Sequence, residues 1–160
     1  MANFHELQKR AKAIKPKRVR VDLFNYIKTI EKIFIDANIE QLEQHKNSKG
    51  NQLRNSDASY TGFYSRTTEL YANLSNPKAT KKAGDPYNFL WSGEFLSGFE
   101  SYITTGKVEI GNTGTGAGKK ADFFDGYTDL FGVTMENLAE INKSKLLPFM
   151  QLYYRNRLKV

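Results

Sequence analysis

The residues that come closest to a chemical motif form a glycine-rich run, GNTGTGAGKK, from Gly111 to Lys120. The run follows a strand-like stretch and ends in lysine, which is how phosphate-binding loops are built. The spacing fails, because a Walker loop ending at Lys119 needs glycine in place of Thr113 and serine or threonine in place of Lys120. The dinucleotide pattern fails too, since Lys119 stands where its third glycine belongs.

The same run contains no apolar residue larger than alanine, so it is unable to pack. It is therefore predicted to be a mobile loop that becomes ordered on a partner. Its candidate assembly contacts are Gly114, Gly116, Lys119 and Lys120.

No residue set predicts catalysis, a metal or a cofactor. His5 and His45 are far apart in the sequence, and solvated helix positions explain both. Asp122, Asp125 and Asp129 lack the alternating acids and the closing glutamate of a calcium loop. The chain has no cysteine, which excludes thiol nucleophiles, disulfides and cysteine metal sites. We therefore expect a protein that is not an enzyme.

The net charge of +7 is concentrated in a basic arm, residues 1–20, which holds seven basic residues against the single acid Glu6. The rest of the chain carries 17 basic and 16 acidic residues. A solvated helix face with a disordered tail is one interpretation, and contact with DNA phosphates or an acidic protein is the other. Phe4 is the only aromatic residue in the arm, so any DNA contact should be independent of sequence. The candidate contacts are Lys9, Arg10, Lys12, Lys15, Lys17, Arg18 and Arg20.

Two helices are expected in the first third of the chain. Residues 3–15 have Asn3 as a possible cap and apolar residues at three- and four-residue steps, and Pro16 should end this helix. Residues 21–45 have the strongest helical pattern, with Asp22 in the first turn and an apolar face through Ile27 and Phe34. This long amphipathic helix is expected to cover a sheet.

The segment from Tyr87 to Gly111 is the expected centre of the core, because it holds the only tryptophan, Trp91, among other aromatic residues. Residues 102–105 and 107–110 are β-branched runs on either side of Gly106, which predicts a hairpin. A lone hairpin is marginal in water and needs helices on one face. Further on, Thr134 is predicted to cap a last helix. Pro148 should either kink this helix or begin a second one.

Together these elements predict an α+β fold, in which a long N-terminal helix and a C-terminal helix pack on a small antiparallel sheet, with an extended arm and loops. The expected organisation is the arm, residues 1–20, and one domain, residues 21–160. No apolar run of about 18 residues and no cleavable leader is present, so neither a membrane span nor a secretory signal is expected.

Five motifs follow one another along the chain: KGNQL at 49–53, KKAGDPY at 81–87, WSGEFLSGF at 91–99, VEIG at 108–111 and FGVTMENL at 131–138. In this order they resemble structural proteins of tailed bacteriophages, the group of virion morphogenesis, tail-completion and neck ring proteins, in versions from Bacteroidota phages including crAss-like phages.

The resemblance implies a homo-oligomeric ring between capsid and tail, formed in the host cytoplasm and retained in the virion. Portal and other neck or tail proteins would be its neighbours, packaged DNA would pass through it, and no membrane would be involved. Partner-facing residues are also expected at the C-terminal end, at Tyr153, Tyr154, Arg155 and Arg157. The alternative function is a sequence-independent DNA-binding accessory protein that acts through the arm.

Overall fold

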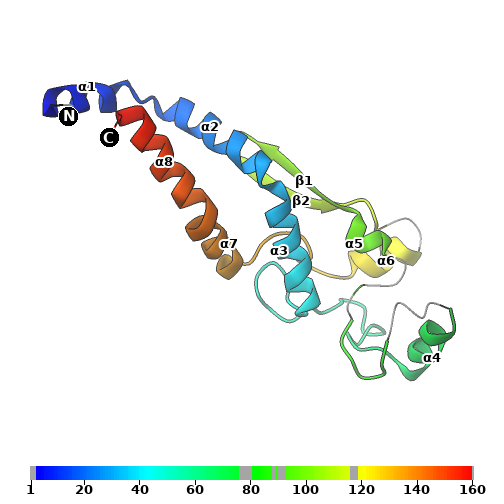
Figure 1. The fold of residues 1–160 in the computed structure, drawn as a ribbon. Helices are drawn as coiled ribbons and strands as arrows, with labels where there is room; N and C mark the ends of the chain where they lie inside the picture. Colours follow the sequence, from blue (N-terminus) through cyan, green and yellow to red (C-terminus); the bar gives the residue numbers. More distant parts are fainter. Residues whose placement is uncertain (1–2, 76–80, 88, 90–92, 116–118, 160) are drawn as a thin grey trace.

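The computed structural model describes residues 3–75, 81–87, 89, 93–115 and 119–159, and it confirms the α+β class. The molecule is elongated, with both chain ends side by side at one end and α4 at the other (Figure 1). Its elements are α1 (Phe4–Ala13), α2 (Pro16–Thr29), α3 (Glu31–Glu43), α4 (Arg66–Ser75), α5 (Glu94–Ser97), β1 (Phe99–Thr104), β2 (Lys107–Asn112), α6 (Lys119–Asp125), α7 (Met135–Ile141), the π-helical turn η1 (Asn142–Leu146) and α8 (Leu147–Leu158).

The basic arm is helical, so the expectation of an extended arm is wrong for its described part. Asn3 caps α1 as predicted, because its side chain accepts a hydrogen bond of 2.9 Å from the backbone N–H of Glu6. Pro16 does not simply end this helix; it is the first residue of α2, where the missing N–H is not needed. The proposed boundary between residues 20 and 21 therefore lies inside α2.

The long helix expected at 21–45 is divided into α2 and α3 at Ile30, whose φ of −116° leaves the helical range. Helix α3 ends in a Schellman motif. In it, the N–H of Lys46 donates to the carbonyl of Gln41, and the N–H of His45 donates to the carbonyl of Leu42. His45 occupies the left-handed position of this motif, with φ +60°, where glycine is usual. Its Nδ1 lies 3.0 Å from the carbonyl oxygen of Tyr87, so the prediction of a solvated His45 is wrong.

The predicted hairpin is confirmed, with β1 and β2 antiparallel and Ile103 opposite Val108. These two side chains and Ile110 pack on a cluster formed by Ile27, Phe34 and Ile141. The alternate residues of the strands, such as Glu100 and Tyr102, are exposed. Alternation therefore selects the face that α2 and α3 cover, as the sequence predicted.

A second cluster is mainly aromatic and surrounds α5 and α6. Phe95 and Phe124 stack with ring centroids 4.3 Å apart, and Phe89 and Tyr127 meet edge to face at 5.4 Å. Ile110 packs against both clusters and connects them. The central segment therefore contributes to the core as expected, whereas Trp91 lies outside the described residues.

Two buried amides on α3 hold the segment that precedes α7. Asn38 donates to the carbonyl of Leu130 and accepts from the N–H of Gly132, both at 3.0 Å. Gln41 donates to the carbonyl of Gly132 at 2.7 Å and accepts from the N–H of Thr134 at 3.0 Å. Each amide thus satisfies one backbone carbonyl and one backbone N–H, as a paired strand does in a sheet. These bonds fix the irregular segment 130–134 against α3.

The predicted cap of the last helix is confirmed, since Thr134 Oγ1 accepts a hydrogen bond of 3.2 Å from the N–H of Asn137. The helix continues through η1 into α8, and Pro148 lies in the first turn of α8. There α8 packs on α2, with the rings of Tyr26 and Phe149 stacked at 4.1 Å. The C-terminal helix α8 therefore packs on another helix, whereas α7 and η1 reach the cluster beneath the sheet through Leu138, Ile141 and Leu146.

Candidate anion-binding groove between the chain ends

The start of α2 and the end of α8 are joined at Asp22, whose side chain is only 16% exposed. Its carboxylate accepts a hydrogen bond of 3.1 Å from Nε of Arg18, one turn earlier on α2. The Tyr153 hydroxyl donates to it at 3.0 Å, and the Arg157 guanidinium lies 3.5 Å away. Burial and the bond to Asp22 raise the pKa of Tyr153, so this phenol stays a donor.

The last turn of α1 is attached to the same place through Arg10. Its guanidinium donates to the carbonyl of Leu158 at 2.9 Å and lies 3.7 Å from the Glu6 carboxylate. Leu158 is the last residue of α8, so a cation stands at the negative end of that helix dipole. Two segments at opposite ends of the sequence therefore form one surface.

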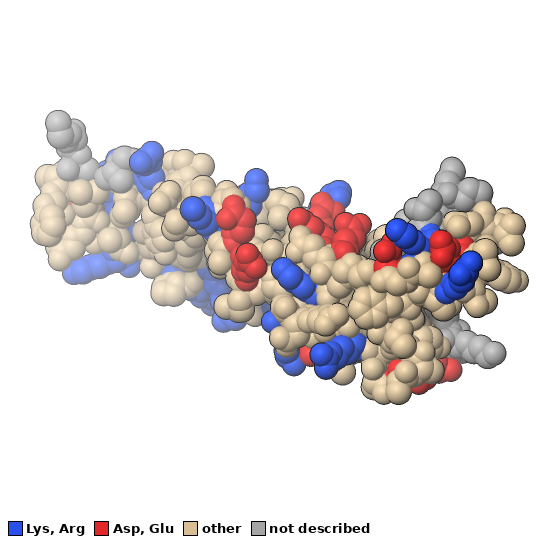
Figure 2. All heavy atoms as spheres, turned by 90° about the horizontal axis from the view of Figure 1, so that it is seen from below, with Lys and Arg blue, Asp and Glu red and all other residues tan. Residues whose placement is uncertain are grey.

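Between these helices lies a groove of about 260 Å³, called the anion groove below. It is lined by Arg10, Ala13, Ile14, Lys15, Arg18, Tyr153 and Arg157, with no acidic residue among them. On the face drawn in Figure 2, the end of the molecule that carries α1 shows Lys and Arg atoms and no Asp or Glu atoms. The residue before α2, Lys15, makes no side-chain cap, so the positive end of that helix also faces this region.

This arrangement can bind an anion. Each guanidinium has five N–H groups, and the contacts to Asp22, Glu6 and Leu158 use only some of them. The remaining donors suit the oxygens of a phosphate or a carboxylate. The partial neutralisation by Asp22 fixes the positions of Arg18 and Arg157 and lowers the net charge of the groove.

Only part of the predicted contact set converges here. Arg10, Lys15 and Arg18 from the arm meet Tyr153 and Arg157 from the C-terminal end. The other predicted residues lie outside the lining: Lys9, Lys12, Lys17, Tyr154 and Arg155 are exposed elsewhere on these helices, and Arg20 lies over the hairpin turn at Gly106.

The prediction of a mobile loop is wrong for residues 111–115. Gly111 belongs to β2, and the N–H of Thr113 bonds to the carbonyl of Gly98 at 2.9 Å. Gly114 packs directly on the backbone carbonyl of Glu94, with no space for a Cβ. A glycine at position 114 is thus needed for close packing within the chain. Gly116 lies outside the described residues, and so do the side chains of Lys119 and Lys120, which begin α6.

The sequence did not indicate that Asp22 joins the two chain ends. It placed Asp22 only as an acid in the first turn of the helix expected at 21–45. One signal was available, because Asp22 is the only acid between Glu6 and Glu31 and follows Arg18 by four residues. Its contacts with Tyr153 and Arg157 depend on the docking of α8.

Within the described part of the chain, no cluster of three histidine or acidic side chains could hold a metal ion. None of the described helices is long and apolar enough to cross a membrane. Comparison with protein-family models, curated proteins and solved structures gives no match in any of the three.

Proposed function

We propose that the chain is a structural subunit of a tailed-phage virion that assembles as a ring in the neck or tail-completion complex. Assembly contacts are its function, its place is the virion, and portal, neck or tail proteins are its neighbours. The sequence motifs described above suggest this role. The observation that carries it is the presence of large exposed apolar side chains on two separate parts of one elongated chain.

The first of these surfaces is on α4, where Leu70, Tyr71 and Leu74 are 59%, 68% and 86% exposed. Leu70 and Leu74 are one helical turn apart, so they lie on the same face of α4. The opposite side of the helix is anchored by Ala72, which is fully buried. This helix therefore presents an apolar face, called the α4 face below, that no described residue covers.

The second surface is on α7 and α8, where Met135, Leu147 and Leu152 are 79%, 53% and 57% exposed. Figure 1 places α4 and α8 in different parts of the molecule. A ring built by rotation uses two different surfaces of each subunit, one for each neighbour. We therefore assign the α4 face to contact with α7 and α8 of a second copy.

The experiment is to measure the mass of the full chain in solution over a range of concentrations, and to image it by negative-stain electron microscopy. We expect one closed ring species that dissociates on dilution. The double variant Leu70→Ser, Leu74→Ser should stay monomeric with an unchanged circular-dichroism spectrum, because exposed substitutions alter stability by only about 0.5 kcal/mol. The matched control, Thr67→Ser with Asn73→Ser on exposed positions of the same helix, should assemble normally. A chain that stays monomeric at every soluble concentration would refute the proposal.

A second function, sequence-independent binding of duplex DNA, is favoured by the convergence of Arg10, Lys15, Arg18 and Arg157 in the anion groove. Fluorescence anisotropy at several salt concentrations tests it, because the slope of log K against log salt is about −0.9 per phosphate contacted. The variant Arg10→Gln, Arg157→Gln should reduce the magnitude of that slope by about 2. Removal of two lysines outside the groove, Lys28→Gln with Lys143→Gln, should change it less. Equal slopes for both double variants would exclude the groove as the DNA site.

A further inference from the structure

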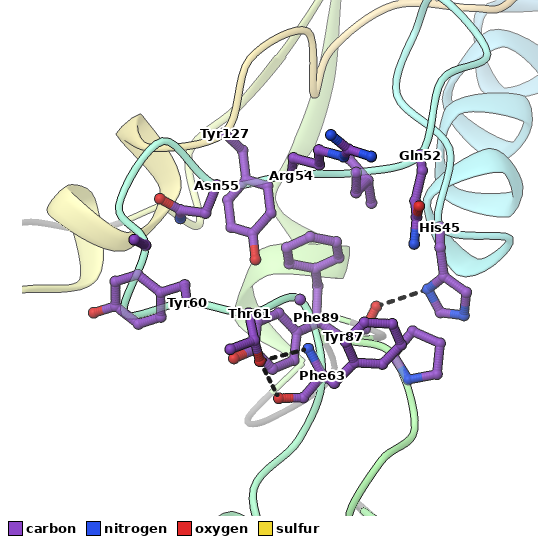
Figure 3. Close-up of a pocket in the computed structure, with 14 residues that line it drawn as sticks. His45, Gln52, Arg54, Asn55, Tyr60, Thr61, Phe63, Tyr87, Phe89 and Tyr127 are labelled. Atoms are coloured by element: carbon purple, nitrogen blue, oxygen red, sulfur yellow. Dashed lines mark hydrogen bonds between the residues drawn. The ribbon is translucent and has the colours of Figure 1, made fainter.

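An aromatic cavity of about 400 Å³ lies between the end of α3, residues 52–63 and the segment around Tyr87 (Figure 3). It shares no residue with the anion groove. Its aromatic walls are formed by Tyr60, Phe63, Tyr87, Phe89 and Tyr127. Polar side chains, among them His45, Gln52, Asn55 and Thr61, complete the lining. The volume lies within the range of small-ligand sites, about 300–1,000 Å³.

The first polar group that faces this cavity is the phenol of Tyr127, a residue that is only 6% exposed. Its oxygen is buried and has no hydrogen-bond partner in the described part of the chain. The neighbouring amide of Asn55 is directed to the backbone, since it donates to the carbonyl of Phe123 at 3.0 Å and accepts from the N–H of Asp57 at 2.8 Å. Figure 3 shows the Tyr127 hydroxyl directed into the cavity, beside Phe89. A buried hydroxyl without a partner is costly, so this donor favours a ligand that brings an acceptor.

The second polar group is Arg54, which lines the cavity and is exposed. No ion pair or hydrogen bond joins its guanidinium to another described residue. It therefore offers a full positive charge and a planar set of donors at the rim. An anionic group would complement it, whereas a purely apolar ligand would leave it unused.

Two residues that line the cavity have a positive φ, which strains the backbone of any residue other than glycine. His45 and Phe89 have φ of +60° and +56°. The Schellman motif accounts for the positive φ of His45 but not for that of Phe89. Such strain is retained where the surrounding structure fixes a side chain in a required place, and here it holds the Phe89 ring against Tyr127.

We propose that the aromatic cavity binds a nucleotide, with the base between the aromatic side chains and the phosphate at Arg54. A base offers a planar ring for aromatic walls and carbonyl or ring-nitrogen acceptors for the Tyr127 hydroxyl. Its phosphate supplies the anion that Arg54 can hold. A tyrosine or phenylalanine side chain from another protein fills the same space but carries no charge for Arg54, which is why the nucleotide is favoured. The same chemistry is found in a free mononucleotide and in one unit of a single strand.

Isothermal titration calorimetry of the full chain tests the proposal with adenosine and thymidine monophosphates, the corresponding nucleosides, and short oligo(dA) and oligo(dT). We expect the monophosphates to bind more tightly than the nucleosides. Tyr127→Phe should weaken both by about tenfold, because one hydrogen bond is lost. Arg54→Gln should weaken the monophosphates and leave the nucleosides unchanged. Tighter binding of oligonucleotides than of monophosphates would identify a strand as the source, and the reverse would identify the free nucleotide.

Matched controls are Tyr102→Phe, a tyrosine on the exposed face of the hairpin, and Arg66→Gln at the start of α4. Both should bind as the unmodified chain does. Tyr127→Phe should also unfold at the same temperature as the unmodified chain or higher without ligand, since it removes an unpaired group. Absence of binding for all probes, equal affinity for monophosphates and nucleosides, or equal affinity of Tyr127→Phe and the unmodified chain would each overturn the proposal. None of these results depends on whether rings form.

Discussion

The sharpest test of the fold is the replacement of Asn38 by leucine. Asn38 is fully buried on α3, and its amide makes two hydrogen bonds of 3.0 Å to the backbone at Leu130 and Gly132. Leucine has the same branched shape and the same number of side-chain heavy atoms, and it keeps α3 helical. Its methyl groups are larger than the amide atoms, so a cost of overpacking adds to the loss of the two hydrogen bonds.

The expected magnitude follows from the groups left behind. One buried carbonyl and one buried N–H lose their partners, and each costs about 1–3 kcal/mol. The sum, about 2–6 kcal/mol, is a large share of the roughly 5–15 kcal/mol that stabilises a typical domain. Combining the change with Gln41→Leu leaves two further backbone groups unpaired, at Gly132 and Thr134, and should prevent folding.

Urea unfolding followed by far-ultraviolet circular dichroism measures the effect. We expect the midpoint to fall with an unchanged slope, and the melting temperature to fall by roughly 2–4 °C per kcal/mol. The control is Lys32→Ala on the same helix, which removes only an exposed ion pair with Asp36 and should cost less than about 1 kcal/mol. If Asn38→Leu proved as stable as this control, the amides would not be what fixes residues 130–134.

Three further predictions concern charge and close packing. Burial lowers the pKa of Lys81 to about 8, whereas the unfolded chain keeps the ordinary 10.5, so stability should rise as the pH increases from 8 towards 10. The urea midpoint of Lys81→Met should not show that rise, because methionine carries no titrating group. Gly114→Ala places a Cβ against the carbonyl of Glu94 and should lower the free energy of unfolding by about 1–3 kcal/mol. Gly50→Ala meets no atom within 4 Å and should lower it by only about 1 kcal/mol, because of its φ of +81°. Equal urea midpoints for the two variants would contradict this. Asp22→Asn should lower stability by about 1 kcal/mol and tighten duplex binding by the anion groove, because it removes the acid that pairs with Arg18 and Arg157. Unchanged affinity in fluorescence anisotropy would show that the groove does not bind DNA.

Local patterns accounted for the parts of the fold that depend on neighbours in the sequence. The Asn3 cap, the hairpin around Gly106 and the Thr134 cap are each encoded within a few residues, and each is confirmed. Pro16 shows the limit of such patterns, because proline suits both the end of one helix and the first position of the next. The break at Ile30 had no local signal, since the apolar face runs through it without interruption.

The candidate sites depended more strongly on distant residues. Arg10 and Leu158 are 148 positions apart, and Asp22 and Tyr153 are 131 apart, so no spacing rule could join them. Gly114 was misinterpreted because glycine permits a mobile loop and also permits close packing on Glu94. The aromatic cavity was not predicted at all, since its aromatic walls come from three separate stretches of the chain.

The sequence by itself determined the α+β class, the uneven charge and the local helix and turn signals, because these follow from composition and from contacts between near neighbours. Only the tertiary structure decided that the two chain ends share one basic groove and that buried amides hold residues 130–134. It also decided that the Tyr127 hydroxyl lies beside an aromatic cavity, without a hydrogen-bond partner among the described residues. The physical reason is that burial and charge pairing depend on which surfaces meet, and those surfaces are brought together by packing of distant segments.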